Sequence, residues 1–368
     1  MVTFPMIGVR RGTRFYLLTV CWRGLACASL LYLALTSAAS AETETRFFRI
    51  GTAATGGSFF EIGGVVALAI SSPVEGSACG PSGGCGVPGL VAVAQATRGS
   101  MENLRLIDNR QIESGFVQAD LAAMAYSGTG VFADQGAMSQ LRAIASLFPE
   151  ALHVVVRVDS PIRSIGELAG RVVAIGEPGS GTQVNAKALL AAAGFGEGDV
   201  VTKGLRAAQA AEEMKNGTVD ALIVAGSYPI PAVQQLAAAV PIRLVPVVGQ
   251  VAKKLQSRFS SYTPTIIPAG VYRTVDTDTA SVGSHALWLV GAHVDEALVH
   301  DITRAVWSEA AAKLFAGLDP IGRRIQISNA LKGVSLPLHP GAERFYREKG
   351  MATELPVGGE PPAEGVTR

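Results

Sequence analysis

The chain has 368 residues, 48% of them apolar and 17% charged, so it can bury the core of two or three domains. The formal net charge is +1 and aromatic residues make up only 6%. This balance excludes a strongly basic surface and the stacking platforms with which many proteins hold nucleic acid, so we expect no nucleic-acid partner.

The first 41 residues differ in composition from the rest of the chain. They contain four Arg residues and no acid, followed by a mostly apolar stretch at 25–35 and small residues at 37–41. This order is typical of a secretory signal peptide, and we predict cleavage after Ala41, because Ala39 and Ala41 occupy the two small-residue positions. Export by this signal predicts a periplasmic protein. The alternative is an N-terminal membrane anchor, for which the apolar stretch is short.

Two cysteines remain after this predicted cleavage. Cys79 and Cys85 are separated by five residues. In an exported protein this spacing predicts one local disulfide, with two free thiols as the alternative. A metal site is disfavoured, because structural metals usually take four ligands and no His lies nearby.

One local pattern recurs along the chain: an apolar strand, a turn rich in small or hydroxyl residues, and a helix. The segments that carry it span residues 47–70, 114–126, 171–193 and 221–239. Strands alternating with helices predict parallel sheets covered by helices on both faces. Ligands of such sheets lie beyond the carboxyl ends of the strands, where helix N-termini favour an anion.

The segment between the second and third of these units is extended. Residues 141–147 and 153–158 are predicted as strands with a short break between them, which suits a crossing between two lobes. Later, residues 265–272 and 285–290 are again strand-like, and residues 294–315 are predicted as one amphipathic helix. We therefore expect the chain to return to its first lobe near its end.

These features predict a division of the chain into five parts. The parts are a signal peptide (1–41), the first part of lobe 1 (42–147), lobe 2 (148–265), a return to lobe 1 with C-terminal helices (266–350) and a disordered tail (351–368). A ligand cleft lies between the lobes in this prediction. We expect a hinge motion on ligand binding, with strands near 147–156 and 265–275 as the crossing.

The enzyme motifs in the chain are incomplete or poorly placed. Residues 179–184 match G-x-G-x-x-G except that Val184 replaces the third glycine. Residues 80–84 match G-x-S-x-G, but they lie in a Gly/Pro loop between the two cysteines, where no strand-to-helix elbow is expected. The five His residues form no HExxH motif. We therefore predict no enzyme, no catalytic residues, no metal and no cofactor.

The ordered set of motifs resembles the TAXI group of solute receptors, the extracytoplasmic binding proteins of TRAP-type (tripartite ATP-independent periplasmic) transporters. The motifs are TGGSFF (55–60) with GG (63–64), GSMENL (99–104), FVQAD (116–120), LRAIASL (141–147), GEPGSGT (176–182), IPAGVY (267–272), NALKG (329–333) and LHPGAERFY (338–346). Each motif alone is weak, but together they follow the order of the family over residues 46 to about 350.

The resemblance implies an α/β fold like that of type II periplasmic binding proteins, with two α/β lobes, a central ligand cleft and a double chain crossover. It implies a receptor that captures a small carboxylate or amino acid, glutamate-like, and delivers this solute to a TRAP membrane permease without using ATP. The alternatives are a secreted enzyme on the same fold and a sensory binding module.

The resemblance also implies a set of ligand-binding residues. They are Thr55, Gly57, Ser58, Phe59, Asn103, Gln118, Ser180, Gly181, Thr182 and Ser227. Ser58 and Thr182 could donate to a carboxylate or serve only as helix N-caps. Asn103 could bind the ligand or only hold a turn of its own lobe. Phe59, where many relatives have Tyr, is expected to pack on the carbon chain of the ligand.

Overall fold

The computed structural model describes Thr3 and residues 45–72, 86–318 and 320–354. All elements below belong to one compact unit, Thr45–Arg368. The predicted signal peptide, Cys79, Cys85 and most of the predicted tail lie outside the described residues. Within those residues, no helix is long and apolar enough to cross a membrane.

One part of the sheet consists of parallel strands that each lead into a helix. β1 (Arg46–Gly51) lies between β4 (Leu90–Gln95) and β5 (Ser114–Gln118) and runs parallel to both. The helices that follow β1, β4 and β5 are α2 (Ser58–Ile70), α3 (Ser100–Asp108) and α4 (Ala119–Ser127). The short strands β2 (Ser71–Ser72) and β3 (Val87–Pro88) extend this edge of the sheet, and η1 (Gly130–Phe132) follows α4.

A second part of the sheet repeats this arrangement. β7 (Val172–Ala174) lies between β8 (Val201–Lys203) and β9 (Ala221–Gly226), again parallel to both. The helices and short strand of this part are η2 (Ile165–Leu168), α5 (Gly181–Ala193), α6 (Ala207–Lys215), α7 (Pro231–Ala239), β10 (Ile242–Leu244) and α8 (Gly249–Arg258). The four predicted strand-to-helix segments are therefore all present.

Two long antiparallel strands join the two parts into one sheet. β6 (Leu141–Arg157, 17 residues) and β12 (Thr279–Gly291, 13 residues) pair with each other, and β11 (Thr263–Ile267) pairs with β12. β12 also pairs with β5 of the first part, whereas β6 pairs with β9 of the second part. The chain therefore crosses between the parts twice, as the predicted fold requires.

The break predicted between residues 147 and 153 is absent, because β6 continues through Pro149. Proline lacks a backbone donor and is normally confined to edges or bulges of a sheet. Here the register of β12 against β6 shifts between Ala286 and Leu287, next to the pairing of His285 with Pro149. β9 pairs with β6 over Ala151–Val156 and does not reach Pro149, so the proline occupies a position where β6 pairs with β12 alone.

Two other expectations differ from the structure. The second long strand is β12, which lies later in the chain than residues 265–275. The single helix expected over 294–315 is two helices, α9 (Glu296–Val306) and α10 (Glu309–Ala316). Ser308 separates them, because its side chain accepts a hydrogen bond from the Ala311 N–H at 3.1 Å and starts a new helix. The elements that follow are η3 (Gly322–Arg324), η4 (Ile327–Asn329) and α11 (Pro340–Glu348).

The hydrophobic core is divided along the two long strands. One cluster of buried side chains contains residues of 48–148 and 286–346, and two others contain residues of 151–282. We call the first group lobe 1 and the second group lobe 2. The predicted α/β class with two lobes and a double crossover is confirmed, whereas the residue boundaries of the predicted domains remain a prediction.

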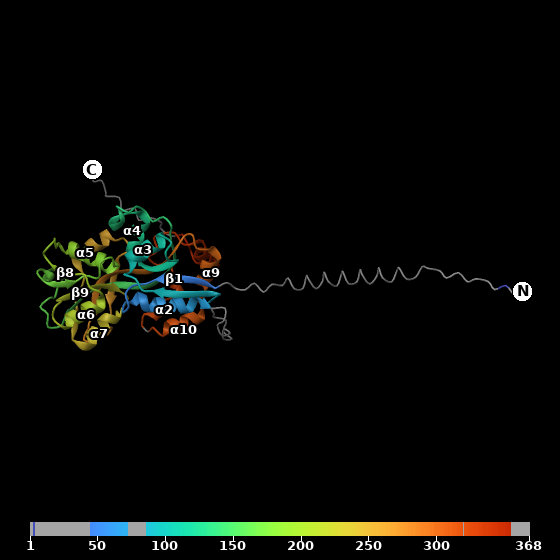
Figure 1. The fold of residues 1–368 in the computed structure, drawn as a ribbon. Coiled ribbons are helices and arrows are strands. Elements are labelled where there is room, and N and C mark those ends of the chain that lie inside the picture. The colour runs from blue at the N-terminus through green and yellow to red at the C-terminus, as the bar shows by residue number, and fades with distance from the viewer. Residues whose placement is uncertain (1–2, 4–44, 73–85, 319, 355–368) are drawn as a thin grey trace. The chain divides into compact units, whose positions relative to one another are not determined.

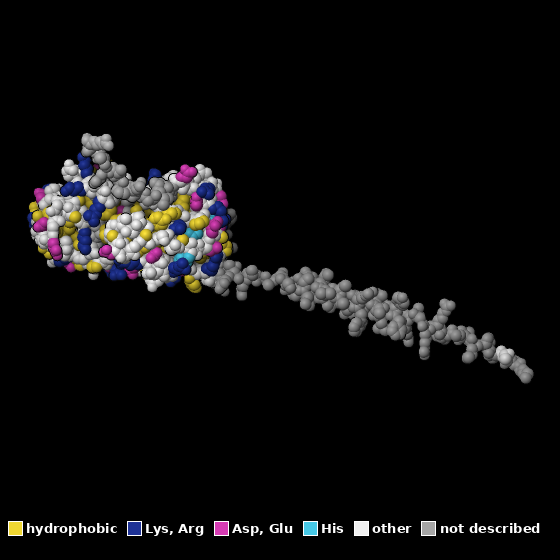
Figure 2. All heavy atoms as spheres, turned by 90° about the horizontal axis from the view of Figure 1, so that it is seen from above, with side chains coloured by type: hydrophobic (Ala, Val, Ile, Leu, Met, Phe, Trp, Pro, Cys, Tyr) yellow, Lys and Arg dark blue, Asp and Glu magenta, His cyan; other side chains and the backbone are white. Residues whose placement is uncertain are grey.

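Helices cover both faces of the sheet in each lobe. In lobe 1, α3 and α4 lie on one face and α2 and α10 on the other; in lobe 2, α5 lies opposite α6 and α7 (Figure 1). Acidic and basic side chains are interspersed on the face of this unit seen in Figure 2. This mixture agrees with a chain whose basic and acidic residues number 31 and 30.

Close packing of α2 on β1 predicts opposite effects of alanine at two neighbouring glycines. A Cβ at Gly63 would lie 2.4 Å from Thr52 Cγ2, whereas a Cβ at Gly64 has no atom within 4 Å. Gly63→Ala should therefore destabilise the protein by roughly 1–3 kcal/mol through overpacking. Gly64→Ala should stabilise it by about 0.5–1 kcal/mol, because glycine is unfavourable inside a helix. Urea denaturation measures both, and stabilisation by both changes would contradict the close packing.

Candidate functional site

A pocket lies where the parallel strands of both lobes end. Its lining comprises residues 53–59, 98–100, 176–177, 180–182, 205–208 and 222–226, with Gln118, Glu150 and Ile230. These segments follow β1, β4, β5, β7, β8 and β9 or belong to them, and Glu150 lies on the crossing strand β6. The pocket therefore occupies the position that the strand–turn–helix pattern predicts for a ligand.

Several helices begin at this pocket. The first turns of α2, α3, α5 and α6 contribute lining residues, and the residue before α7 also lines it. At α5 the Ser180 side chain accepts a hydrogen bond from the Gln183 N–H at 3.1 Å, but no side chain caps the starts of α2, α3 or α6. Uncapped N–H groups and aligned peptide dipoles make this end of both lobes favourable for an anion.

Most of the predicted ligand-binding residues line this pocket. They are Thr55, Gly57, Ser58, Phe59, Gln118, Ser180, Gly181 and Thr182. The capping roles considered for Ser58 and Thr182 belong instead to Gly57, the N-cap of α2, and Ser180, the N-cap of α5. Ser58 and Thr182 lie inside their helices, so neither hydroxyl is needed as a cap.

Asn103 does not line the pocket. It is fully buried, and its Nδ2 donates hydrogen bonds to the carbonyls of Gly51 (3.1 Å), Thr52 (2.7 Å) and Phe116 (2.8 Å). Its Oδ1 accepts a hydrogen bond from Thr97 Oγ1 at 2.8 Å. The structure therefore places Asn103 in the alternative role, in which it holds the turn after β1 within its own lobe.

Ser227 also lies outside the pocket lining. It is fully buried, one residue after β9, and its Oγ has no hydrogen-bond partner among the described residues. Ser227 directly follows Gly226, which lines the pocket, but Ser227 itself is not part of the lining.

The Phe59 ring belongs to the core of lobe 1 as well as to the pocket. Its side chain is only 7% exposed. It makes edge-to-face contacts with Phe116, at 5.8 Å between ring centroids, and with Phe148, at 6.0 Å. Little of the ring is therefore left for the carbon chain of a ligand.

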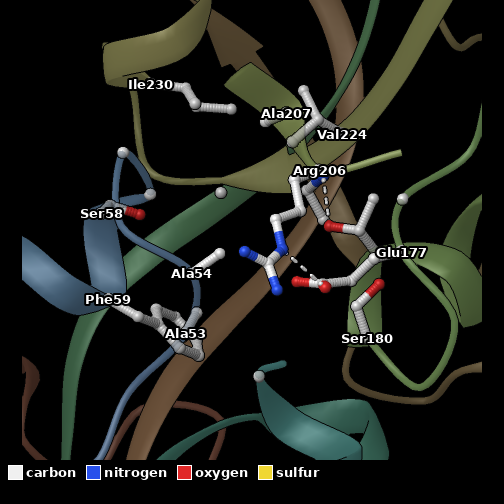
Figure 3. A pocket seen from close by; sticks show the side chains of 18 of the residues that line it. Ala53, Ala54, Ser58, Phe59, Glu177, Ser180, Arg206, Ala207, Val224 and Ile230 are labelled. Carbon is white, nitrogen blue, oxygen red and sulfur yellow. Dashed lines mark hydrogen bonds and ion pairs between the residues drawn. The ribbon is translucent and has the colours of Figure 1, made fainter. Parts of the chain in front are cut away.

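Two charged residues that line the pocket, Arg98 and Arg206, were not among the predicted ligand-binding residues. Arg206 Nε donates to Glu177 Oε2 at 2.9 Å, and Figure 3 shows the guanidinium extending into the pocket beside Glu177. Arg98 Nε donates to Glu102 Oε2 at 3.0 Å. The local pattern could have found Arg206, which precedes α6 after β8, but β8 has only three residues and does not stand out as a strand.

Buried polar side chains form the floor of the pocket and continue behind it. We call Gln118, Asp120, Glu150 and Asn185 the acceptor cluster; their exposed fractions are 5%, 3%, 4% and 0%. Asn185 Nδ2, in lobe 2, donates to Asp120 Oδ2, in lobe 1, at 2.8 Å. Glu150 was missed because the sequence analysis placed it in a break between strands.

Burial changes the protonation of the two carboxyl groups of this cluster. It raises the pKa of Asp120 to about 6, because the charged form loses its hydration. Burial, reinforced by the nearby Asp120 charge, raises the pKa of Glu150 to about 8. A pKa of about 8 makes Glu150 mostly a neutral acid at neutral pH.

Comparison with known proteins assigns the chain to a family. The model of the NMT1-like family matches residues 50–350. Similar solved structures include the periplasmic aliphatic sulphonate binding protein SsuA from Escherichia coli, with 15% identity, coverage of 85% of this chain and 96% of that chain, and a TM-score of 0.40. The alkanesulfonate-binding protein SsuA from Xanthomonas axonopodis pv. citri, bound to MOPS, has 16% identity, coverages of 83% and 84%, and a TM-score of 0.43.

An ancestral arginine-binding protein bound to arginine is similar at 14% identity, with coverages of 74% and 97% and a TM-score of 0.43.

The bonds of Asn103 predict a loss of stability when they are removed. Asn103→Ala removes an amide whose two N–H groups are shared among three carbonyls, so it should destabilise the protein by roughly 1–3 kcal/mol. The matched control is Asn216→Ala, at an exposed position after α6, which should change stability by less than about 0.5 kcal/mol. Urea denaturation compares the two, and equal stabilities would contradict the structural role of Asn103.

Proposed function

We propose that this chain, which belongs to the NMT1-like family, is an extracytoplasmic receptor that captures a small carboxylate or amino acid between its two lobes. The observation that carries this proposal is the pocket itself, which takes its lining from the ends of parallel strands and the first turns of helices in both lobes. A solute held there contacts both lobes at once, as a receptor that closes around its ligand requires.

The polar groups of the pocket favour a carboxylate. The starts of α2 in lobe 1 and α5 in lobe 2 face the same space, so peptide dipoles of both lobes stabilise a negative charge. Arg98 and Arg206 add planar guanidinium groups that suit a carboxylate. Each is paired with a glutamate, and side-chain exposures of 54% and 58% leave both accessible to solutes. A carboxylate solute would compete with Glu177 for Arg206.

The remaining lining suits a small solute with a short carbon chain. Ala53 and Ala54 in lobe 1 lie across the pocket from Val224 and Ile230 in lobe 2, and Figure 3 shows these apolar side chains around the space that Arg206 enters. Gln118 and Glu150 supply polar groups at the floor. A glutamate-like solute offers groups of each kind.

Delivery of the solute to a TRAP membrane permease rests on the resemblance of the ordered motifs to the TAXI receptors. Five of those motifs, at 55–60, 99–104, 116–120, 141–147 and 176–182, contribute lining residues or lead directly to them. Closure of the lobes about β6 and β12 would present a ligand-dependent surface to the permease. A secreted enzyme would instead convert the bound solute, and a sensory module would hand its signal to another partner.

The charges of the pocket predict which variants lose affinity for solutes. Thermal-shift assays and titration calorimetry on the mature protein should identify binding of L-glutamate, another amino acid or a dicarboxylate. Arg98→Ala and Arg206→Ala should each weaken that binding about tenfold, because each removes a charge-assisted hydrogen bond. Arg157→Ala is the matched control, because Arg157 pairs with Asp159 outside the pocket lining. The proposal fails if no small carboxylate or amino acid raises the melting temperature.

A further inference from the structure

The acceptor cluster contains buried oxygen atoms that lack a hydrogen-bond partner. They are Gln118 Oε1, Asp120 Oδ1, Glu150 Oε2 and Asn185 Oδ1, none of which has a partner at hydrogen-bond geometry among the residues that the structure describes. The buried Tyr262 hydroxyl, which interacts with Asn185 and lies near both carboxyls, is a neutral donor beside them. Buried polar atoms are normally paired, so a group of unpaired atoms in one place calls for a missing partner.

The four side chains are neighbours that come from four different elements. Gln118 ends β5, Asp120 lies in the first turn of α4, Glu150 lies on β6, and Asn185 lies on α5. Asn185 bonds Asp120 at 2.8 Å, and the Asp120 charge acts on Glu150, which also interacts with the Gln118 side chain. The cluster therefore joins lobe 1, the crossing strand and lobe 2.

The unpaired atoms are of one chemical kind. Gln118 Oε1, Asn185 Oδ1 and the ionised Asp120 carboxylate can only accept, and Glu150 becomes an acceptor of the same kind once it gives up its proton. The complement of such a set is a group that carries positive charge and donors. Hard oxygen ligands suit hard cations and ammonium groups, whereas thiolate and imidazole ligands select transition metals. A pKa of about 6 leaves Asp120 mostly ionised at neutral pH, whereas Glu150, with a pKa of about 8, is mostly neutral, so one positive charge balances the cluster.

The cluster can be reached from the pocket. Gln118 and Glu150 line the pocket, whereas Asp120 and Asn185 lie behind them and are not part of the lining. A Cβ at Gly181 would lie 1.9 Å from Gln118 Oε1, so the start of α5 packs closely against the Gln118 side chain. A cation bound here would touch groups of both lobes.

We propose that the acceptor cluster is a cation subsite at the floor of the pocket, which takes one singly charged positive group. Two sources have this chemistry: a free alkali cation of the size of Na⁺ or K⁺, and the ammonium group of a bound amino acid. The second source rests on the proposed function, because it requires the amino acid to occupy this pocket. A positive group from either source would contact both Asp120 of lobe 1 and Asn185 of lobe 2.

The first arm of the test uses the wild-type mature protein without any organic solute. Its melting temperature is measured in NaCl, KCl and choline chloride at equal ionic strength. A free-cation subsite predicts a saturating rise in NaCl or KCl and no such rise with choline, which is too large for the cluster. Choline therefore controls for the general effect of salt.

The second arm compares L-glutamate with glutarate, which has the same two carboxylates and lacks the ammonium group. An ammonium subsite predicts at least tenfold tighter binding of L-glutamate by titration calorimetry. This comparison uses only the wild-type protein, so it does not depend on any variant that folds poorly.

The variant Glu150→Gln keeps the shape of the side chain and removes its ability to carry charge. It should abolish the saturating effect of the alkali cation, or the preference for L-glutamate over glutarate, depending on the source. The matched control is Glu213→Gln, which removes a carboxylate paired with Lys203 on the surface of lobe 2 and should change neither.

Two results together overturn the inference. NaCl, KCl and choline chloride would change the melting temperature equally, and L-glutamate and glutarate would bind with equal affinity. If both acids then bind, the proposed solute receptor stands without a cation subsite. If neither acid binds and an alkali cation still acts through Glu150, the cation subsite stands and the choice of solute is wrong. These outcomes separate the failure of one proposal from the failure of the other.

Discussion

The two long antiparallel strands β6 and β12 are the constraint on which the rest of the structure depends. They pair with each other through the middle of the sheet, and each continues into pairing with the strands of one lobe. Backbone hydrogen bonds therefore connect the core of lobe 1 with the two core clusters of lobe 2. The crossing itself is extended chain, so we expect it to bend when the lobes move, and it directs the strand ends of both lobes toward one pocket. The Asn185–Asp120 hydrogen bond also links the lobes at this pocket.

The arrangement concentrates opposite electrostatic preferences in a small volume. Helix starts and two arginines favour negative charge at the walls of the pocket, whereas the acceptor cluster at its floor favours positive charge. Buried carboxyls without a counter-charge are costly, which is why the pKa of Glu150 rises to about 8. A solute that carries both charges would relieve both preferences, and this match gives the pocket its selectivity in our account.

The sequence predicted the features that depend on local pattern and missed those that depend on packing. The turns after β1 and β7 were predicted because apolar strands, small residues and helices follow one another there. The continuity of β6 was missed because Pro149 is typical of a break, although the strand tolerates it where β6 pairs with β12 and not with β9. Asn103 could not be assigned from sequence, since only the fold reveals that its amide reaches three carbonyls of its own lobe.

The central claim is that one solute is held by both lobes at once across the β6 and β12 crossing. Small-angle X-ray scattering of the mature protein, with and without a saturating solute, tests this claim most directly. The account predicts a smaller radius of gyration in the presence of the solute, because the lobes close around it. An unchanged radius at proven saturation would contradict it, since the solute would then be held without any closure of the two lobes.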